Sequence, residues 1–273
     1  MKNVITIDVE DWFHVCGCEP ETLPGNLPKR VRPNVEKILS LLAEYDVAAT
    51  FFVLGSLAED DPTLVPMIAE AGHEIASHGY SHRLLTRLGP DEFRHELKLT
   101  GDIIKRQTGR RPAGFRAPQW SLKMTDSWAY DILHDEGYLY DSSLNPLPLV
   151  GDGSGPLFPF GVRNGKVDMV ELPPMVTPTA AGNLPTGGGW GFRFFPLRMI
   201  RSTIRRYNHS GAAAILYLHP REMESDGPRL PLPPLRKFAT YGPRTEAGGR
   251  LRNLLENFRF QTMEQLASSW QSA

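Results

Sequence analysis

Short apolar runs alternate along this chain with longer stretches in which apolar residues recur at helical spacing. The short runs predict strands at 4–7, 49–54, 113–116, 138–140, 170–172 and 213–218, with another ending beside Ile75 and Ala76. Helices are predicted where Val35, Ile38, Leu39, Leu41 and Leu42 repeat, at 64–71 before Gly72, and from Pro90 to about Gly109. Repeated strand-then-helix units predict an α/β fold whose parallel sheet is closed, or nearly closed, into a barrel.

Proline and glycine gather in segments that do not fit this pattern. They predict loops at 20–33, 146–159 and 228–243, and we expect the last two to cover the same face of the barrel. The glycine run 187–189 is not followed by a Lys-Ser or Lys-Thr pair, so it does not predict a phosphate-binding loop. We interpret it as a flexible or close-packed loop near the mouth of a site.

Length and charge narrow the classes of partner. The 273 residues fit one barrel or two small domains, and we favour one. A net charge of −1 gives no reason to expect nucleic acid or an anionic membrane surface as the main partner. The basic runs at 110–111 and 201–206 are interpreted as solvated faces.

Cellular location is predicted from what the chain lacks. Only four or five apolar residues follow Met1-Lys2-Asn3 before acids begin, which does not match a signal peptide, and no apolar run reaches membrane-spanning length. We therefore expect a cytoplasmic protein. Cys16 and Cys18, one residue apart, are a poor disulfide pair and are interpreted as reduced thiols in a loop.

Two histidines four residues apart, His78 and His82, follow the strand that contains Ile75 and Ala76. At that spacing both imidazoles can point the same way and bind one metal ion, with Gly79 relaxing the backbone between them. The alternative is an ordinary pair of surface histidines.

Three acids at the end of the first strand favour a metal site over an ordinary pair of surface histidines. Asp8, Glu10 and Asp11 lie within four residues of one another, and such a cluster is costly unless a cation meets it. A solvated turn or a helix N-terminus would also accommodate acids. One carboxylate and two imidazoles are ligands typical of hydrolytic zinc, with positions left open for water.

The carboxyl ends of the predicted strands all carry polar residues suited to catalysis, which are Asp8, His78, Arg116, Asp141 and His219. In barrels of this kind, residues that act together lie at these ends.

The chain resembles the polysaccharide deacetylases of the NodB-homology type (carbohydrate esterase family 4-like), with the motifs of that family in the same order over most of its length. The motifs that carry the resemblance are Asp8-Val-Glu, His78-x3-His82, Phe115-Arg-Ala-Pro, Tyr140-Asp-Ser and Leu218-His219. Asp8-Val-Glu-Asp-Trp-Phe, Gly187-Gly-Gly-Trp-Gly-Phe-Arg and Tyr217-Leu-His-Pro more narrowly resemble the deacetylases of exosortase/PEP-CTERM exopolysaccharide loci.

The resemblance implies a distorted (β/α)7-type barrel, with one domain over residues 1–273 and a family-specific C-terminal extension from about residue 220. It implies metal-dependent removal of N-acetyl groups from aminosugars of a bacterial exopolysaccharide or its lipid-linked precursor. The expected cofactor is Zn²⁺, with Co²⁺, Ni²⁺, Fe²⁺ or Mn²⁺ as alternatives. The expected partner is an N-acetylated oligo- or polysaccharide, and the oligomeric state stays open.

Roles for individual residues follow from the same resemblance. The commonest family pattern has two adjacent aspartates, whereas Val9 follows Asp8 here. The spaced form would make Asp8 the base and Glu10 a metal ligand beside His78 and His82, with Asp11 as the competing carboxylate ligand.

Three further residues would complete the reaction. His219 would protonate the leaving nitrogen, Asp141 would hold His219, and Arg116 would orient Asp8.

Each role has a structural alternative. Arg116 could be a surface ion-pair partner, Asp141 a turn or cap, and His219 a buried histidine. Trp120, Trp190 and Phe192 are candidates for stacking on sugar rings, with core packing as the alternative.

Three rival functions stay open at this point. The chain could hydrolyse another amide, such as a cyclic ureide or a lipid-linked formamide. Two histidines and a carboxylate also describe non-haem iron oxygenases. A non-catalytic glycan-binding module is the third.

Overall fold

The computed structural model describes residues 1–18, 22–148, 150–153, 155–164, 167–224, 226–242 and 247–271. Its strands are β1 (Lys2–Val9), β2 (Thr50–Val53), β3 (Glu74–Ser77), β4 (Gly114–Phe115), β5 (Tyr140–Asp141), β6 (Phe160–Asn164), β7 (Val167–Glu171), β8 (Thr177–Thr179), β9 (Gly182–Leu184), β10 (Ile215–Leu218) and β11 (Arg259–Gln261). The helices are α1 (Val31–Glu44), α2 (Gly55–Asp60), α3 (Leu64–Glu70), α4 (Pro90–Thr108), α5 (Ser127–Asp135), α6 (Gly189–Phe194), α7 (Leu197–His209), α8 (Pro234–Tyr241), α9 (Ala247–Asn257) and α10 (Met263–Gln271).

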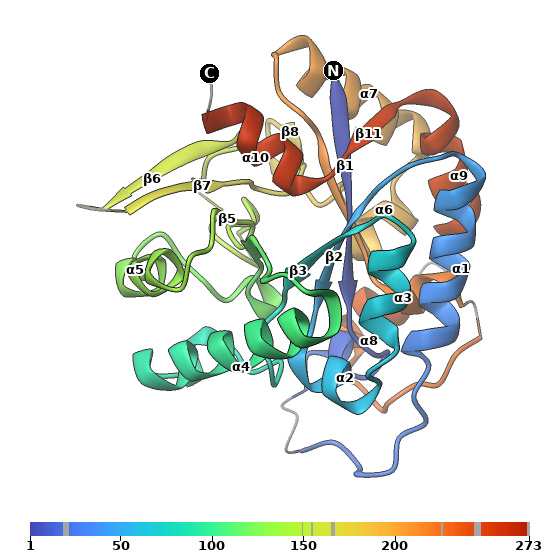
Figure 1. The fold of residues 1–273 in the computed structure, drawn as a ribbon. Helices are drawn as coiled ribbons and strands as arrows, with labels where there is room; N and C mark the ends of the chain where they lie inside the picture. The colour runs from blue at the N-terminus through green and yellow to red at the C-terminus, as the bar shows by residue number, and fades with distance from the viewer. Residues whose placement is uncertain are drawn as a thin grey trace.

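A curled, mainly parallel sheet forms the centre of the molecule (Figure 1). Its strand order is β10-β1-β2-β3-β4-β5-β7-β6, and β11 pairs with the start of β1. Strands β6 and β7 pair antiparallel, and the other pairings in this sheet are parallel. The predicted α/β class with a parallel sheet is confirmed. Within the described residues β6 and β10 do not pair, so the sheet is a curled half-barrel.

Most predicted elements lie where the apolar pattern placed them. Strand β1 extends the predicted strand 4–7 by two residues at each end, and α3 and α4 match the predicted helices closely. Strand β5 begins at Tyr140 and not at Tyr138, because the Tyr138 N–H donates to the Leu133 carbonyl and so closes α5.

One predicted loop contains a helix. The proline-rich segment 228–243 includes α8, which begins at Pro234. Proline is well tolerated in the first turn of a helix, because the N–H that it lacks would have no helical partner there. The loop prediction for this segment was therefore wrong in its second half.

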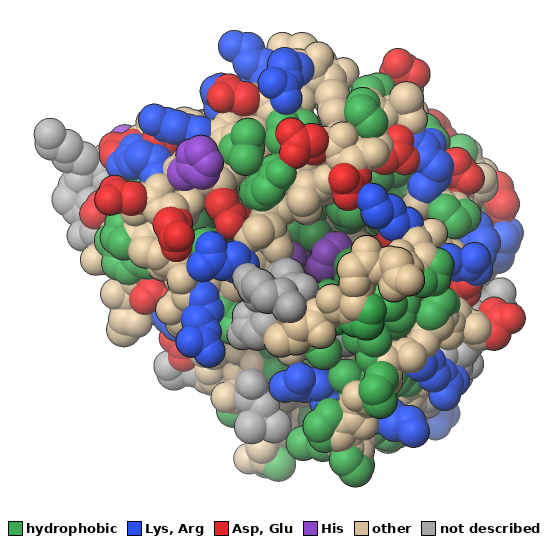
Figure 2. Space-filling model, turned by 90° about the horizontal axis from the view of Figure 1, so that it is seen from below, with side chains coloured by type: hydrophobic (Ala, Val, Ile, Leu, Met, Phe, Trp, Pro, Cys, Tyr) green, Lys and Arg blue, Asp and Glu red, His purple; other side chains and the backbone are tan. Residues whose placement is uncertain are grey.

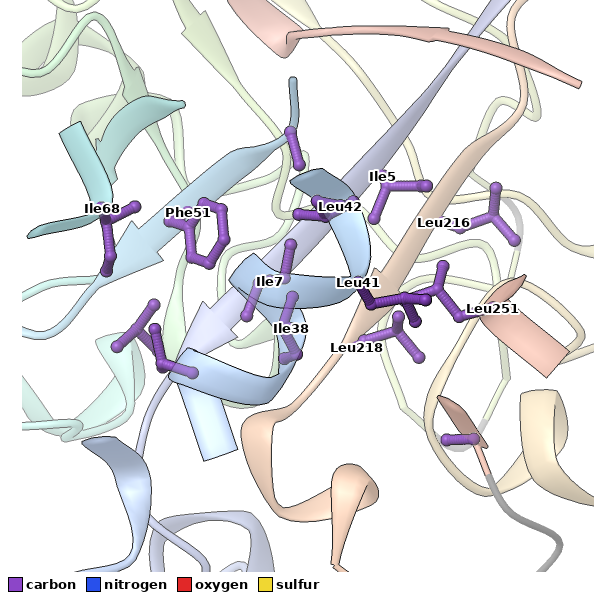
Figure 3. Packing of buried hydrophobic residues seen from close by; sticks show 14 of the residues in the cluster. Ile5, Ile7, Ile38, Leu41, Leu42, Phe51, Ile68, Leu216, Leu218 and Leu251 are labelled. Atoms are coloured by element: carbon purple, nitrogen blue, oxygen red, sulfur yellow. The ribbon is translucent and has the colours of Figure 1, made fainter. Parts of the chain in front are cut away.

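The main apolar core lies between the sheet and the helices beside β1 and β2. Figure 3 shows the apolar side chains of α1 packed against β1, β2 and β10, with Leu251 of α9 beside Leu41 of α1. The side chains in contact there include Ile7, Ile38, Leu42, Phe51 and Leu218, all essentially inaccessible to solvent. Each such side chain stabilises the fold by about 1.5–3 kcal/mol on burial. This packing fixes the carboxyl ends of β1 and β10 relative to each other.

No helix among the described residues is both long and apolar enough to cross a lipid bilayer. The cytoplasmic location stays a prediction.

Strand β4 depends on a glycine that no larger residue can replace without a shift of its neighbours. A Cβ added to Gly114 would lie 1.8 Å from Cζ of Tyr140, its partner in β5. The Tyr140 ring cannot retreat easily, because it is fully buried and its hydroxyl donates to Glu74 at 2.6 Å. The close approach of these two short strands holds Arg116 and Asp141 at the same edge of the sheet.

We predict that Gly114→Ala lowers the free energy of unfolding by about 1–3 kcal/mol through overpacking. Urea denaturation would measure the change. Gly25→Ala is the control, because an added Cβ there meets no atom within 4 Å. Equal unfolding midpoints for the two variants would show that β4 and β5 can separate without cost.

Candidate metal centre

The carboxyl ends of β1, β3, β4 and β10 meet at one edge of the sheet and supply most of the candidate residues. Asp8 is the second-last residue of β1 and Glu10 directly follows that strand. His78 directly follows β3, Arg116 follows β4, and His219 follows β10. Figure 2 shows this edge from below, with a histidine visible at the bottom of a hollow.

Glu10, His78 and His82 form a buried cluster whose ligand atoms all lie within 4.8 Å of one another. Glu10 Oε2 lies 2.5 Å from Nε2 of His82 and 3.9 Å from Nε2 of His78. It accepts no hydrogen bond within the described part of the chain. Buried lone pairs at this spacing repel one another unless a proton or a cation lies between them.

The protonation states of the cluster suit a metal ligand set. Burial alone would raise the pKa of Glu10, but the imidazoles, with His82 first, hold that pKa well below its usual range. His78 Nδ1 lies 2.8 Å from the Arg116 carbonyl, which accepts a hydrogen bond only when Nδ1 is protonated. Nε2 of the neutral ring is then left with a free lone pair, the usual arrangement of a metal-binding histidine. One oxygen and two nitrogens fit a divalent ion such as Zn²⁺.

The loop between the two histidines is held by a residue that the sequence analysis missed. Glu96, on α4, accepts hydrogen bonds from the N–H groups of Tyr80 and Ser81 at 3.1 and 3.2 Å, and from the Ser81 hydroxyl at 2.5 Å. Gly79 and His82 both adopt positive φ, which lets the loop turn tightly enough for both imidazoles to face Glu10. A lone glutamate on an amphipathic helix gives no sequence signal for this role.

Asp11 does not belong to the cluster. Its carboxylate accepts hydrogen bonds from the N–H groups of Trp12, Arg30 and Val31, between 2.8 and 3.3 Å. Arg30 and Val31 begin α1, so Asp11 caps that helix. Of the two competing carboxylates, the structure therefore brings Glu10 to the imidazoles and uses Asp11 elsewhere.

His14 lies beside the cluster without joining it. Its Nδ1 accepts the Asp11 N–H at 3.0 Å, and its ring centroid is 5.1 Å from that of His82. Burial lowers the pKa of His14 to about 3, so the ring is neutral and carries its proton on Nε2. Nε2 of His14 is therefore a hydrogen-bond donor and not a metal ligand.

Asp8 is paired with Arg116, as the sequence predicted. Arg116 Nη1 lies 2.7 Å from Asp8 Oδ1, and the guanidinium is fully buried. It also donates to the Thr6 hydroxyl and to the carbonyl and hydroxyl of Ser142, and it lies 4.1 Å from the Phe52 ring centroid. The arginine is thus fixed on all sides and holds one oxygen of Asp8 in place.

His219 faces both carboxylates from the other side of the cleft. Its Nε2 lies 3.3 Å from Glu10 Oε1 and 3.9 Å from Asp8 Oδ2. Glu222, one turn further on, has its Oε2 3.8 Å from His219 Nδ1 and accepts the His219 backbone N–H at 3.1 Å. Glu222 is itself held by Arg193 at 2.9 Å. Although burial lowers the pKa of His219, Glu222 and the other carboxylates outweigh this and raise it.

Asp141 does not hold His219, and that part of the sequence prediction was wrong. The Asp141 carboxylate accepts hydrogen bonds from the Ser143 hydroxyl at 2.6 Å and the Ser143 N–H at 3.2 Å, and it is hydrogen-bonded to Glu171. Burial, followed by the charge of Asp141, raises the pKa of Glu171 well above its usual value. The pair therefore shares a proton and supports the loop after β5, from which Ser142 binds Arg116.

The cleft above the cluster has a volume of about 480 Å³. Residues from both halves of the chain line it, including Trp120, Asn145, Trp190, Tyr217 and Arg221. Both polar atoms of the Asn145 side chain are buried without a hydrogen-bond partner among the described residues, so this amide is a further polar group in the cleft wall. Neither Asn145 nor Tyr217 was predicted from the sequence to line the site.

The three aromatic residues proposed for sugar stacking differ in position. Trp120 lines the cleft but is only 8% exposed, with its ring centroid 4.8 Å from that of Tyr217. Trp190 lines the cleft and is partly exposed. Phe192 is buried in the main core, so its proposed role as a stacking platform was wrong.

Two family models match consecutive parts of the chain. Residues 25–132 match the polysaccharide deacetylase family, and residues 142–268 match a domain of unknown function, DUF3473. The first range contains His78, His82 and Arg116, and the second contains His219. Asp8 and Glu10 precede both ranges.

Individual relatives agree with the first match. The chain is 35% identical over 121 residues to a peptidoglycan-N-acetylglucosamine deacetylase of Bacillus cereus, covering 40% of this chain and 44% of that protein. It is 32% identical over 110 residues to a peptidoglycan deacetylase of Helicobacter pylori, covering 40% of this chain and 36% of that protein. The chain thus spans less than half the length of these curated relatives.

Among solved structures, a Mycobacterium smegmatis protein assigned to the polysaccharide deacetylases has the same fold. The TM-score is 0.67 at 21% identity, over 100% of this chain and 92% of that one. The likeness includes the C-terminal half of the chain, which lies outside the range that the polysaccharide deacetylase family model matches.

We predict that Glu10→Gln and Asp11→Asn separate the two carboxylates by their effect on metal affinity. Glu10→Gln should weaken Zn²⁺ binding at least about 100-fold, since changes to outer-shell groups alone cost about 10–100-fold. Asp11→Asn should bind Zn²⁺ like the wild type, because an asparagine oxygen can still cap α1. Isothermal titration and elemental analysis would measure both, and a loss confined to Asp11→Asn would reverse the assignment.

The buried pair of Asp141 and Glu171 predicts a dependence of stability on pH. A carboxyl whose pKa is raised on folding stabilises the protein fully below its unfolded pKa, near 4.5 for glutamate, and this contribution is lost as pH rises through the raised value. Glu171→Gln keeps an acceptor for the Leu144 N–H and removes the titration. Its free energy of unfolding relative to the wild type should therefore rise steadily above pH 5.

Chemical denaturation at several pH values would measure this difference, with Glu70→Gln, at an exposed position, as the control. A difference between Glu171→Gln and the wild type that does not change with pH would mean that Glu171 is ionised in the folded protein.

Proposed function

We propose that this chain is a metal-dependent hydrolase of N-acetyl groups on aminosugars, because residues 25–132 match the polysaccharide deacetylase family. The substrate we propose is a bacterial exopolysaccharide or its lipid-linked precursor. The observation that carries the proposal is the buried cluster of Glu10, His78 and His82 in a cleft that also contains Asp8 and His219. The resemblance of Asp8-Val-Glu-Asp-Trp-Phe and Tyr217-Leu-His-Pro to the exosortase/PEP-CTERM-associated branch supports the exopolysaccharide assignment.

Glu10, His78 and His82 would hold the metal ion, and Zn²⁺ fits their oxygen and nitrogen atoms best. A bound Zn²⁺ would supply Lewis-acid chemistry, polarising the amide carbonyl and lowering the pKa of water to about 7. The buried, ionised carboxylate of Glu10 favours a cation at this position.

Asp8 would act as the general base. Arg116 occupies Asp8 Oδ1, which leaves Oδ2 on the side that faces His219 across the cleft. A carboxylate held in one orientation can accept a proton from the attacking water without first rearranging. Asp8 is adjacent to the metal ligands and does not belong to their cluster, which suits a base better than a ligand.

His219 would act as the general acid. The carboxylates around it raise its pKa, so the ring stays protonated to a higher pH than an ordinary histidine and can give a proton to the leaving nitrogen. Glu222, fixed by Arg193, takes the positioning role that the sequence analysis gave to Asp141. An amine is a poor leaving group unless it is protonated, so this step is essential to amide cleavage.

We also propose that the whole chain folds as one domain. Strands β10 and β11, from the C-terminal half, pair directly with β1, and the cleft is lined from both halves. The segment from about residue 220 would be an extension that covers the cleft and completes the sheet.

We predict that Asp8→Asn lowers acetate release about 10²- to 10⁴-fold, the usual contribution of a general base. Its Zn²⁺ content should not change. The assay uses N-acetylglucosamine oligomers and a lipid-linked acetamido sugar, with metal removed by a chelator and then restored. Asp135→Asn, on the surface, is the control.

Adding a formamido sugar and a cyclic ureide to these substrates separates the rival functions. Formate or a ring-opened product would indicate a different amide, and oxygen consumption would indicate an oxygenase. Sugar binding without any product, in metal-loaded protein, would indicate a glycan-binding module and would overturn the proposed activity. Asp8→Asn with near-wild-type turnover would overturn only the assignment of the base.

A further inference from the structure

Beside the cleft, α6 and α8 present an apolar surface to solvent, formed by Trp190, Phe194, Leu235 and Phe238 and named here the apolar patch. Leu235 is 80% exposed, Phe194 51% and Phe238 45%. Large apolar side chains that gather on a surface in this way mark sites of interaction more often than scattered ones do.

The apolar patch is held in a fixed arrangement. The Phe238 ring centroid lies 6.1 Å from that of Trp190 and 6.2 Å from that of Phe194, while Trp190 and Phe194 are 5.9 Å apart. Arg193 lies between Trp190 and Phe194 in the sequence of α6 and donates hydrogen bonds to the carbonyls of Thr240 and Gly242 at the end of α8. The two helices therefore pack together as one unit, and this packing holds the exposed aromatic side chains in place.

Positive charge accompanies the apolar patch. The sequence contains no Asp or Glu from 172 to 221 or from 228 to 243, although the chain as a whole carries a net charge of −1. On α8 the exposed Arg236 and Lys237 lie between Leu235 and Phe238, and Arg198 and Arg229 are also exposed. Figure 2 shows hydrophobic side chains beside the hollow, with Lys and Arg side chains around them.

The apolar patch is continuous with the cleft. Trp190 and Arg193 of α6 and Ala239 and Thr240 of α8 line the cleft, so the same two helices form its wall and the exposed surface. A membrane or another molecule that binds the apolar patch would therefore lie against the mouth of the cleft.

We propose that the apolar patch and its basic rim are a docking surface for an anionic lipid bilayer. Apolar side chains enter the boundary between headgroups and acyl chains, while Lys and Arg at the rim attract anionic headgroups. This surface would hold the mouth of the cleft at the membrane, where a lipid-carried substrate is presented. Docking itself does not depend on the proposed catalytic activity.

Two other occupants fit the surface less well. Sugars stack on flat aromatic rings, whereas the most exposed member is the aliphatic Leu235. A second copy of the chain, related by two-fold symmetry, would bring Arg236 and Lys237 of both copies together, and like charges at an interface oppose association.

The test is sedimentation of the full chain with vesicles. Binding to phosphatidylcholine vesicles that contain about one-fifth phosphatidylglycerol is compared with binding to phosphatidylcholine alone, at low salt. We expect the anionic vesicles to bind at least about tenfold more tightly, and added salt to weaken the binding. The double variant Leu235→Ser with Phe238→Ser should lose at least about tenfold in partitioning, as should Arg236→Glu with Lys237→Glu.

Matched controls exclude general effects of the substitutions. Leu139→Ser removes a leucine that is 42% exposed at another surface. Lys105→Glu with Arg106→Glu reverses the charge of two consecutive exposed basic residues on α4, away from the apolar patch. Both should bind vesicles like the wild type. Thermal unfolding of all variants checks that they are folded, and acetate release from a soluble oligosaccharide reports separately on the proposed activity.

Three outcomes would overturn the proposal. The first is no binding of the wild type to anionic vesicles at low salt, and the second is equal binding by wild type and patch variants. The third is a dimer in sedimentation velocity that the patch variants dissociate, since the surface would then join two copies of the chain.

Discussion

Three buried acids at the end of β1 impose the main constraint on this structure. Asp8 and Glu10 are each 3% exposed and Asp11 is fully buried. An uncompensated buried carboxylate is very costly, so each needs a partner of its own. Asp8 has Arg116, Asp11 has the N–H groups that begin α1, and Glu10 has two imidazoles with space for a cation. The different partners explain why neighbouring residues of one type have different roles.

Arg116 links two of these roles. Its guanidinium holds Asp8, while its backbone carbonyl fixes the ring of His78 through Nδ1. The guanidinium in turn depends on Ser142, in the loop that the shared proton of Asp141 and Glu171 supports. Strands β4, β5 and β7 thereby control the positions of the candidate base and of one candidate ligand. This explains why Asp141 lies at the same edge of the sheet without entering the cleft.

The two halves of the chain contribute different parts of the site. Residues up to about 132 provide the candidate metal ligands Glu10, His78 and His82 and the Asp8–Arg116 pair. The later half provides His219, Glu222 and Arg193. The later half also builds α6 and α8, which wall the cleft and carry the apolar patch with its basic rim. The net charge of the whole chain is near zero and conceals the local excess of basic residues beside the cleft, because acidic residues concentrate elsewhere in the chain.

The sequence alone predicts the α/β class, most strands and helices, and the residues at the sheet edge, because apolar periodicity and the alternation of strand-like with helix-like stretches are local properties. It could not decide between Glu10 and Asp11, or find Glu96 and Glu222, since nothing in their spacing shows which way a side chain points. It also placed Asp141 beside His219 and made a loop of α8. Tertiary structure decided these points, because hydrogen-bond partners and surface neighbours are set by contacts between residues far apart in the chain.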